Sequence, residues 1–214
     1  YDPRRKPHST RKRAVTNDVH HLSPVVVAES SIWMVSGFAG PWRNERELSR
    51  VLVYDPRRDK LSRRACPEPI PARYRRGSAG AAAENGFIYV VNGAVGGHLA
   101  SLGARSFNGL SRFDTRTCAW SEVAAGPPRH SRDHFAAILF HNRHYVIGGR
   151  VSSSSHDDVL AHTIRSTEHI YLGAIGHIQS WRSAAPIPTA RAGLAYAVTN
   201  DSILVVGGES NTTQ

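Results

Sequence analysis

Three arginines recur at matching places in the sequence and have the chemistry best suited to binding a ligand. Arg76, Arg132 and Arg191 each precede, by 17 residues, a glycine that closes an apolar strand. A guanidinium group donates paired hydrogen bonds to a carboxylate, sulfate or phosphate. If the repeats pack side by side, we expect the three side chains to converge on one opening and bind an anionic group. The structural alternative is that these arginines hold neighbouring sheets together through backbone carbonyls.

Further polar residues occur on the predicted loops at the same phase of the repeat. Two of them follow Arg132 directly, and the others follow the small-residue pairs that close the strands. We predict that all five contribute to the same ligand-binding site. They are His98, Asp133, His134, Arg150 and Glu209.

Metal and nucleophile chemistry find little support in the sequence. Its 12 histidines include two local groups, but neither has a carboxylate cluster of suitable geometry, so we expect no metal site and no cofactor. These groups are His20 with His21, and His130, His134, His141 and His144. The segment around Ser78 has Arg76 where a nucleophile elbow needs glycine, and it enters a strand, so we expect no catalytic residue.

The two cysteines belong to no metal-binding or redox motif. Cys66 and Cys118 are separated by 52 residues, and they could form one disulfide. The favoured interpretation is two small buried thiols, because free cysteine is among the most buried residue types. Asn200 and Asn211 begin glycosylation acceptor tripeptides, which slightly favour an extracellular location over a cytoplasmic one.

Composition narrows the class of protein. The chain has 214 residues, of which 40% are hydrophobic and 21% charged, so it is globular rather than disordered. Its apolar runs are too short to span a membrane. The net charge is +10, and residues 1–76 alone carry 17 Lys/Arg against 8 Asp/Glu. Such a basic segment can attract nucleic acid, acidic polysaccharide or an anionic membrane surface, but the favoured interpretation is a solvated tail with arginine-rich outer edges. The segment lacks interleaved aromatic residues, so we do not expect nucleic acid as a partner.

The elements that must position these residues are short strands that recur with a fixed period. An apolar strand ending in a small-residue pair occurs four times, and the closing glycines are Gly37, Gly93, Gly149 and Gly208. Their spacings are 56, 56 and 59 residues, which indicates a repeat protein. Before each of these strands comes a second apolar stretch, at 25–28, 79–83, 135–140 and 194–198. A third strand ending in an aromatic residue and a short fourth strand follow each of the first three glycine pairs.

Each repeat therefore predicts four antiparallel strands, and stacking such units radially gives an all-β propeller. The doublets Gly148-Gly149 and Gly207-Gly208, the aromatic residue that ends the third strand, and Trp120 and Trp181 further on resemble the kelch repeat. Ser36-Gly37 and Asn92-Gly93 depart from the glycine doublet, and Leu61 replaces the tryptophan of the first full blade. A helical turn is plausible only at 44–51.

The resemblance implies four blade equivalents in a kelch-type β-propeller. We predict three full blades, at 20–75, 76–131 and 132–190, and half blades at 1–19 and 191–214. The first half blade is indicated because Tyr1-Asp2-Pro3-Arg4-Arg5 repeats as Tyr54-Asp55-Pro56-Arg57-Arg58. We expect the chain to be part of a larger propeller; the alternative is that the two half blades join and close a ring of four.

Two functional hypotheses follow from the resemblance. The first is a non-enzymatic scaffold that binds a protein or an acidic ligand through the arginines and the polar loops 38–49, 94–109 and 151–166. The second is a secreted carbohydrate-active enzyme or a copper oxidase resembling galactose oxidase, which would need a Tyr–Cys pair. Cys118 and Tyr145 are conceivable partners there, although no motif supports the pairing.

Overall fold

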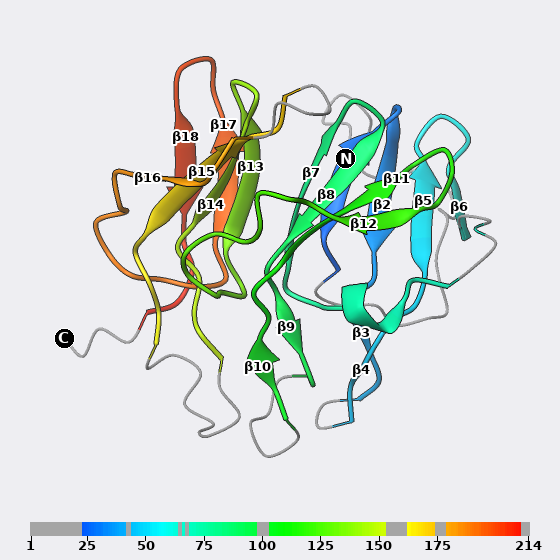
Figure 1. Cartoon of the computed structure of the whole chain (residues 1–214), viewed down its shortest axis with the longest axis horizontal. Helices are drawn as coiled ribbons and strands as arrows, with labels where there is room; N and C mark the ends of the chain where they lie inside the picture. Colours follow the sequence, from blue (N-terminus) through cyan, green and yellow to red (C-terminus); the bar gives the residue numbers. More distant parts are fainter. Residues whose placement is uncertain are drawn as a thin grey trace, which may run out of the picture.

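The computed structural model describes residues 23–41, 44–63, 66, 69–97, 103–152, 162–173 and 179–210. These residues form strands and loops, with a single turn of 3₁₀ helix, η1 (Ala72–Tyr74), among them. No helix in this part of the chain has the length and apolarity required to cross a membrane. The all-β fold class is therefore confirmed (Figure 1).

Three four-stranded antiparallel sheets follow one another along the chain, and a strand pair comes after them. The first blade is β1 (Val25–Ala28), β2 (Ser31–Val35), β5 (Val51–Asp55) and β6 (Lys60–Arg63). The second blade is β7 (Gly80–Glu84), β8 (Phe87–Val91), β11 (Leu110–Asp114) and β12 (Trp120–Glu122). The third blade is β13 (Ala136–Phe140), β14 (Arg143–Ile147), β15 (Thr167–Tyr171) and β16 (Arg182–Ala184). The half blade is β17 (Ala195–Val198) with β18 (Ile203–Val206).

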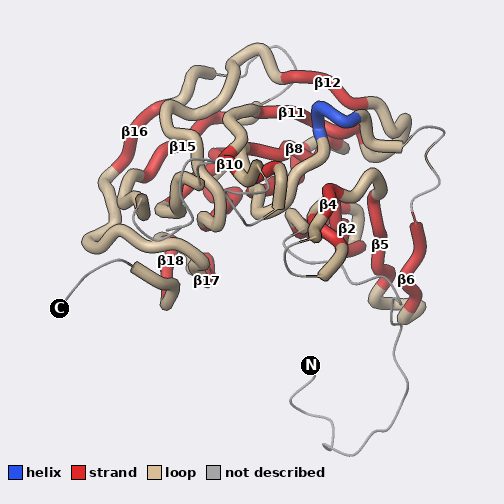
Figure 2. Tube along the Cα trace, turned by 90° about the horizontal axis from the view of Figure 1, so that it is seen from below, coloured by secondary structure: helices blue, strands red, loops and turns tan. Residues whose placement is uncertain are grey.

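The blades are arranged in an arc, as Figure 2 shows. The first strands of neighbouring blades, β1, β7, β13 and β17, contact one another in chain order. Hydrophobic side chains fill the space between consecutive blades. Val90 packs toward the first blade with Trp33, whereas its neighbour Val91 packs toward the third blade with Val146. This alternation covers both faces of β8, which explains why its sequence is apolar at every position.

The closing glycines link each blade to the next. The amides of Gly37, Gly93 and Gly149 donate to the backbone carbonyls of Arg76, Arg132 and Arg191 at 3.0, 3.0 and 2.8 Å. Gly93 has a φ of +112°, and a Cβ there would lie 2.7 Å from both the Ala79 Cβ and the Gly77 carbonyl oxygen. Only glycine fits such a position without strain. The repeat spacing therefore reflects a recurring contact between blades.

Two segments differ from the sequence-based expectation. The helical turn expected at 44–51 is absent: β4 (Arg46–Glu47) pairs there with β3 (Phe38–Ala39) in a two-stranded ribbon. In this ribbon the side chain of Phe38 is fully buried. An exposed helical turn at 44–51 would not bury it. In the loop 94–109, β9 (Ala94–Val95) pairs with β10 (Arg105–Ser106) in the same way.

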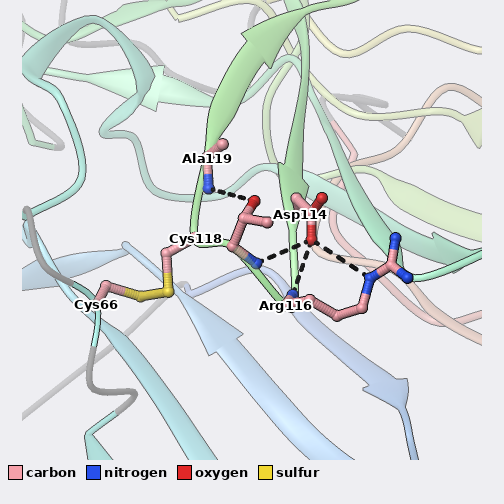
Figure 3. Close-up of a disulfide and its surroundings, with 6 residues drawn as sticks. Cys66, Asp114, Arg116, Cys118 and Ala119 are labelled. Atoms are coloured by element: carbon pink, nitrogen blue, oxygen red, sulfur yellow. Dashed lines mark hydrogen bonds and ion pairs between the residues drawn. A yellow bond between two sulfur atoms is a disulfide. The ribbon is translucent and has the colours of Figure 1, made fainter.

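The interpretation of the cysteines as two buried thiols is wrong. Cys66, which follows β6, forms a disulfide with Cys118 in the turn between β11 and β12 (Figure 3). The bond connects the first blade with the second. Asp114 shapes the turn that carries Cys118, because its carboxylate accepts hydrogen bonds from the amides of Arg116 and Thr117 at 2.8 and 3.1 Å. The packing of the two blades, which the sequence does not show, brings the two sulfur atoms together.

Candidate functional site

Arg76 lies inside the second blade. It is 1% exposed, and its Nη2 donates to the Val90 carbonyl at 2.7 Å and to the Ser111 hydroxyl at 2.9 Å. Its Nη1 donates to the Tyr74 carbonyl at 3.2 Å. The guanidinium thus connects β8 with β11 and with η1. Its Nε has no hydrogen-bond partner in the structure.

Arg132 holds the equivalent place in the third blade and is 0% exposed. Its Nη1 donates to the carbonyls of Gly148 and Ser166 at 3.0 and 3.1 Å, and its Nη2 forms an ion pair with Glu168. Glu168 also accepts a hydrogen bond from the amide of Arg129 at 2.7 Å. A buried carboxylate with several donors is a stable counter-ion for a buried guanidinium.

Burial affects the protonation of both arginines. Removal from water lowers the pKa of Arg76 to about 9, although the neighbouring Tyr74 opposes this shift. Burial also lowers the pKa of Arg132, to about 10, while the charge and hydrogen bond of Glu168 act in the opposite direction. Both guanidinium groups stay protonated at neutral pH, so both are buried positive charges.

The three arginines do not converge on one opening. Arg191 is half-buried, and its Nη1 donates to the Gly207 carbonyl of its own half blade at 2.6 Å. Each side chain therefore holds strands of its own blade, whereas the contact to the preceding blade is made by the arginine's backbone carbonyl. This arrangement is close to the structural alternative, with the difference that the side-chain bonds lie within a blade.

A second cluster lies just before β13 and just after β14 and β18, and it brings together several predicted residues. Asp133 and Arg150 exchange backbone hydrogen bonds of 2.9 Å in both directions. The Asp133 carboxylate also accepts from Arg150 Nε at 3.1 Å and contacts His134 Nδ1 at 2.6 Å. Glu209 extends the cluster, with its Oε1 3.6 Å from Arg150 Nη1. His98 lies outside the described residues.

Asp133 is the buried centre of this cluster. Burial alone raises the pKa of a carboxyl group, but the hydrogen bonds and charges of His134, Ser106 and Arg150 outweigh burial and hold the pKa of Asp133 below its ordinary value. The carboxylate is therefore ionised at neutral pH. It neutralises Arg150 and fixes the orientation of the imidazole of His134.

Sequence analysis missed two serines of this cluster. Ser106 on β10 donates its hydroxyl to Asp133, and the same hydroxyl accepts from the Ser152 amide at 2.8 Å. Ser78 Oγ lies 3.3 Å from His134 Nε2. A signal for Ser78 was present, because Ser78, His134 and Gly193 each stand two residues after a repeat arginine. All three have positive φ, at 51°, 53° and 65°.

The cluster also contains a chain of three hydrogen-bonded side chains next to a guanidinium group. Ser78, His134 and Asp133 form a hydrogen-bonded chain, but Arg150 Nη2 lies 3.4 Å from the same Nε2 that would take a proton from the serine. Within the described ranges, no three His, Cys, Asp or Glu side chains group closely enough to hold a metal ion. Cys118 is disulfide-bonded, so its sulfur is not available to pair with Tyr145.

Three comparisons show which known proteins this chain is similar to. The sequence profile of the KLHDC2/KLHL20/DRC7 kelch-repeats domain matches residues 21–214. The Kelch-like protein terF of Aspergillus terreus is 22% identical over 200 residues, which are 92% of this chain and 37% of that protein. The solved structure of YjhT has a TM-score of 0.65 and 15% identity, with 88% of this chain and 59% of that chain covered. The chain thus spans less than two thirds of the length of each of these two proteins.

Proposed function

The chain belongs to the KLHDC2/KLHL20/DRC7 family of kelch-repeat domains, and from this premise we propose that it is a non-enzymatic module that binds an acidic segment of a partner protein. Membership in the family supports a role as a protein-interaction scaffold. The acidic character of the ligand and the residues that contact it are our proposal. The cluster of Asp133, His134, Arg150 and Glu209, together with the neighbouring Arg191, is the part of the surface that we assign to the contact.

The observation that carries the proposal is the geometry between Arg150 and Glu209. Their side chains are 6% and 54% exposed, and the 3.6 Å between Arg150 Nη1 and Glu209 Oε1 is longer than a hydrogen bond. Glu209 is therefore a loosely held and accessible counter-ion. A carboxylate from a ligand can replace it on Arg150, with a shorter charge-assisted hydrogen bond.

The surrounding loops support such a contact because they are tied to one another. Gly96 donates its amide to Glu47 at 2.6 Å, which joins the loop 38–49 to the loop 94–109. Ser106 donates its amide to the Ser152 carbonyl at 3.0 Å, which joins the latter loop to the one that begins after Arg150. Loops held in one arrangement before binding lose less conformational entropy on binding.

Charge and compartment fit the same proposal. A net charge of +10 accelerates encounter with an acidic partner over distances of about a Debye length. The disulfide between Cys66 and Cys118 supports an oxidising compartment, where such bonds persist. The proposed partner is therefore an acidic protein segment that is encountered outside the reducing cytosol.

The test is a pair of variants expected to act in opposite directions. Peptides would be selected from a random library by their binding to the protein, and the selected peptides would be titrated against it and followed by fluorescence anisotropy. We expect Arg150→Lys to weaken binding about tenfold or more, because lysine cannot reproduce the planar fork. We expect Glu209→Gln to tighten binding, because it removes the competing carboxylate.

Arg116→Lys is the matched control, since Arg116 is exposed at the turn between β11 and β12. It should leave the affinity unchanged. If Arg150→Lys and Arg116→Lys have equal effects, or if selected peptides show no enrichment of Asp and Glu, the proposed acidic-ligand site is wrong.

A further inference from the structure

A buried positive charge in the second blade lacks the counter-ion that its equivalent in the third blade has. Ser111 on β11 stands opposite Val90, and Glu168 on β15 stands opposite Val146, so the two residues hold the same position in their sheets. Glu168 forms an ion pair with Arg132, whereas the residue at the same position beside Arg76 is Ser111, whose hydroxyl accepts a hydrogen bond but carries no charge.

The remaining contacts of Arg76 do not supply the missing charge. Its Nη groups donate to two backbone carbonyls, and its Nε is buried without a partner. The face of the Phe107 ring lies 4.9 Å from the guanidinium carbon. Among the described residues, no carboxylate forms an ion pair with Arg76. A buried charge without a counter-ion is costly, because the interior solvates it poorly.

A pocket of about 160 Å³ adjoins this charge. Arg76 lines it together with the apolar side chains of Phe107, Leu110 and Val123. Arg73 adds a second positive charge at the exposed margin, and the exposed Glu122 adds one negative charge there. The pocket therefore combines a cationic wall, an apolar wall and room for only a few carbon atoms.

We propose that this pocket is a binding site for a small monocarboxylate with a short apolar chain. The carboxylate supplies the negative charge that Glu168 supplies in the third blade, and it pairs with the guanidinium of Arg76, which lines the pocket. The apolar chain packs against Phe107, Leu110 and Val123. Glu122 at the margin disfavours multiply charged anions such as phosphate or sulfate, because like charges repel.

This site is separate from the proposed acidic-segment site, which uses Arg150 and Glu209, and the two proposals can fail independently. The probe is isovalerate, and its neutral amide, isovaleramide, is the matched control with the same apolar chain. We expect isovalerate to raise the melting temperature of the protein in a saturable manner at constant ionic strength. Isovaleramide should produce no such rise.

Ser111→Glu tests the missing counter-ion directly, because it copies the arrangement of the third blade. We expect this variant to bind isovalerate at least about tenfold more weakly, as measured by calorimetry, and to lose the thermal stabilisation. Ser62→Glu on β6 is the control: Ser62 is exposed on the edge strand of the first blade, and the substitution adds the same charge at a position that does not line the pocket. It should bind isovalerate with the affinity of the unmodified protein.

A second measurement needs no variant. In amide NMR spectra of the unmodified protein, isovalerate should shift the resonances of Phe107, Leu110 and Ser111 more than others. Equal stabilisation by isovaleramide, full affinity in Ser111→Glu, or shifts confined to residues away from the pocket would each overturn the proposal.

Discussion

The indole ring of Trp120 stacks on the phenol ring of Tyr74, with centroids 5.1 Å apart and ring planes at 17°. Tyr74 belongs to η1, the segment that leads from the first blade to the second, and Trp120 opens the last strand of the second blade. Phe113 on β11 lies against the same indole at 5.2 Å between ring centroids. The repeat tryptophan thus anchors a connection between blades as well as a strand within one.

We expect Trp120→Ala to lower the free energy of unfolding by about 3 kcal/mol, because it removes a large side chain from this aromatic packing. Trp120→Phe should lose less, since a ring remains to stack on Tyr74. Urea denaturation of both variants measures the difference. Equal losses in the two variants would contradict the stacking argument.

Removal of the disulfide should also destabilise the protein. We expect the double variant Cys66→Ser, Cys118→Ser to lose about 2–4 kcal/mol, because the bond closes a long loop and restricts the unfolded chain. The unmodified protein in reductant should lose a similar amount. Alkylation under denaturing conditions provides the check on the bond itself: two labelled thiols in the absence of reductant would show that the bond does not form.

Stability should decrease in mild acid because of His144 on β14. This imidazole is fully buried, and neither ring nitrogen has a hydrogen-bond partner in the structure. Burial lowers the pKa of His144 from 6.5 to about 4. The unfolded state therefore takes up a proton at a higher pH than the folded state does. The stability contributed by the neutral ring is complete above about pH 6.5 and is lost as the pH falls toward about 4.

The total loss over this range is about 3 kcal/mol, which urea denaturation at several pH values would detect. His144→Leu should flatten this part of the pH profile. His141→Asn, which replaces an exposed histidine, should not. Asp133, whose pKa is lowered, contributes in a more acidic range, because its stabilisation is lost only as the carboxylate is protonated. An unchanged slope in His144→Leu would rule out His144 as the cause.

The ion pair between Arg132 and Glu168 should matter for stability and not for ligand binding. We expect Glu168→Gln to cost about 3–5 kcal/mol, because it leaves a buried guanidinium without its counter-ion. Glu122→Gln, at an exposed position, is the control and should cost little. Arg132→Lys should lower the melting temperature and leave the affinity for acidic peptides unchanged. Weaker peptide binding in Arg132→Lys at full stability would return this residue to the ligand site.

Much of the fold was predictable from the sequence because the strands and turns of each blade follow from patterns within a few neighbouring residues. The apolar strands, the Asn85-Gly86 turn and the closing glycines identify strands within a window of a few residues, and their 56-residue spacing identifies the repeat. The replacement of tryptophan by Leu61 was also readable: Leu61 pairs with Tyr54 as Trp120 pairs with Phe113. The ribbon at Phe38 could not be predicted from the sequence, because strands of two residues leave almost no periodic signal.

The candidate site was predictable in its residue positions and not in its geometry. The repeat phase located Arg76, Arg132 and Arg191, and each of these residues does precede the first strand of its blade. The direction of each side chain depends on what the neighbouring strand offers. The ion pair with Glu168 keeps the Arg132 side chain inside the third blade. The ion pair with Asp133 keeps the Arg150 side chain in the cluster with His134 and Glu209.

The sequence by itself determined the repeat, the strands and the places where arginines enter each blade, because these follow from local spacing. Only the tertiary structure decided that Cys66 meets Cys118 and that Ser78 meets His134, because residues more than 50 positions apart meet only when the blades have packed. The same holds for the missing counter-ion of Arg76. The sequence shows a serine at position 111, but the pairing of β8 with β11 makes that serine the partner of a buried charge.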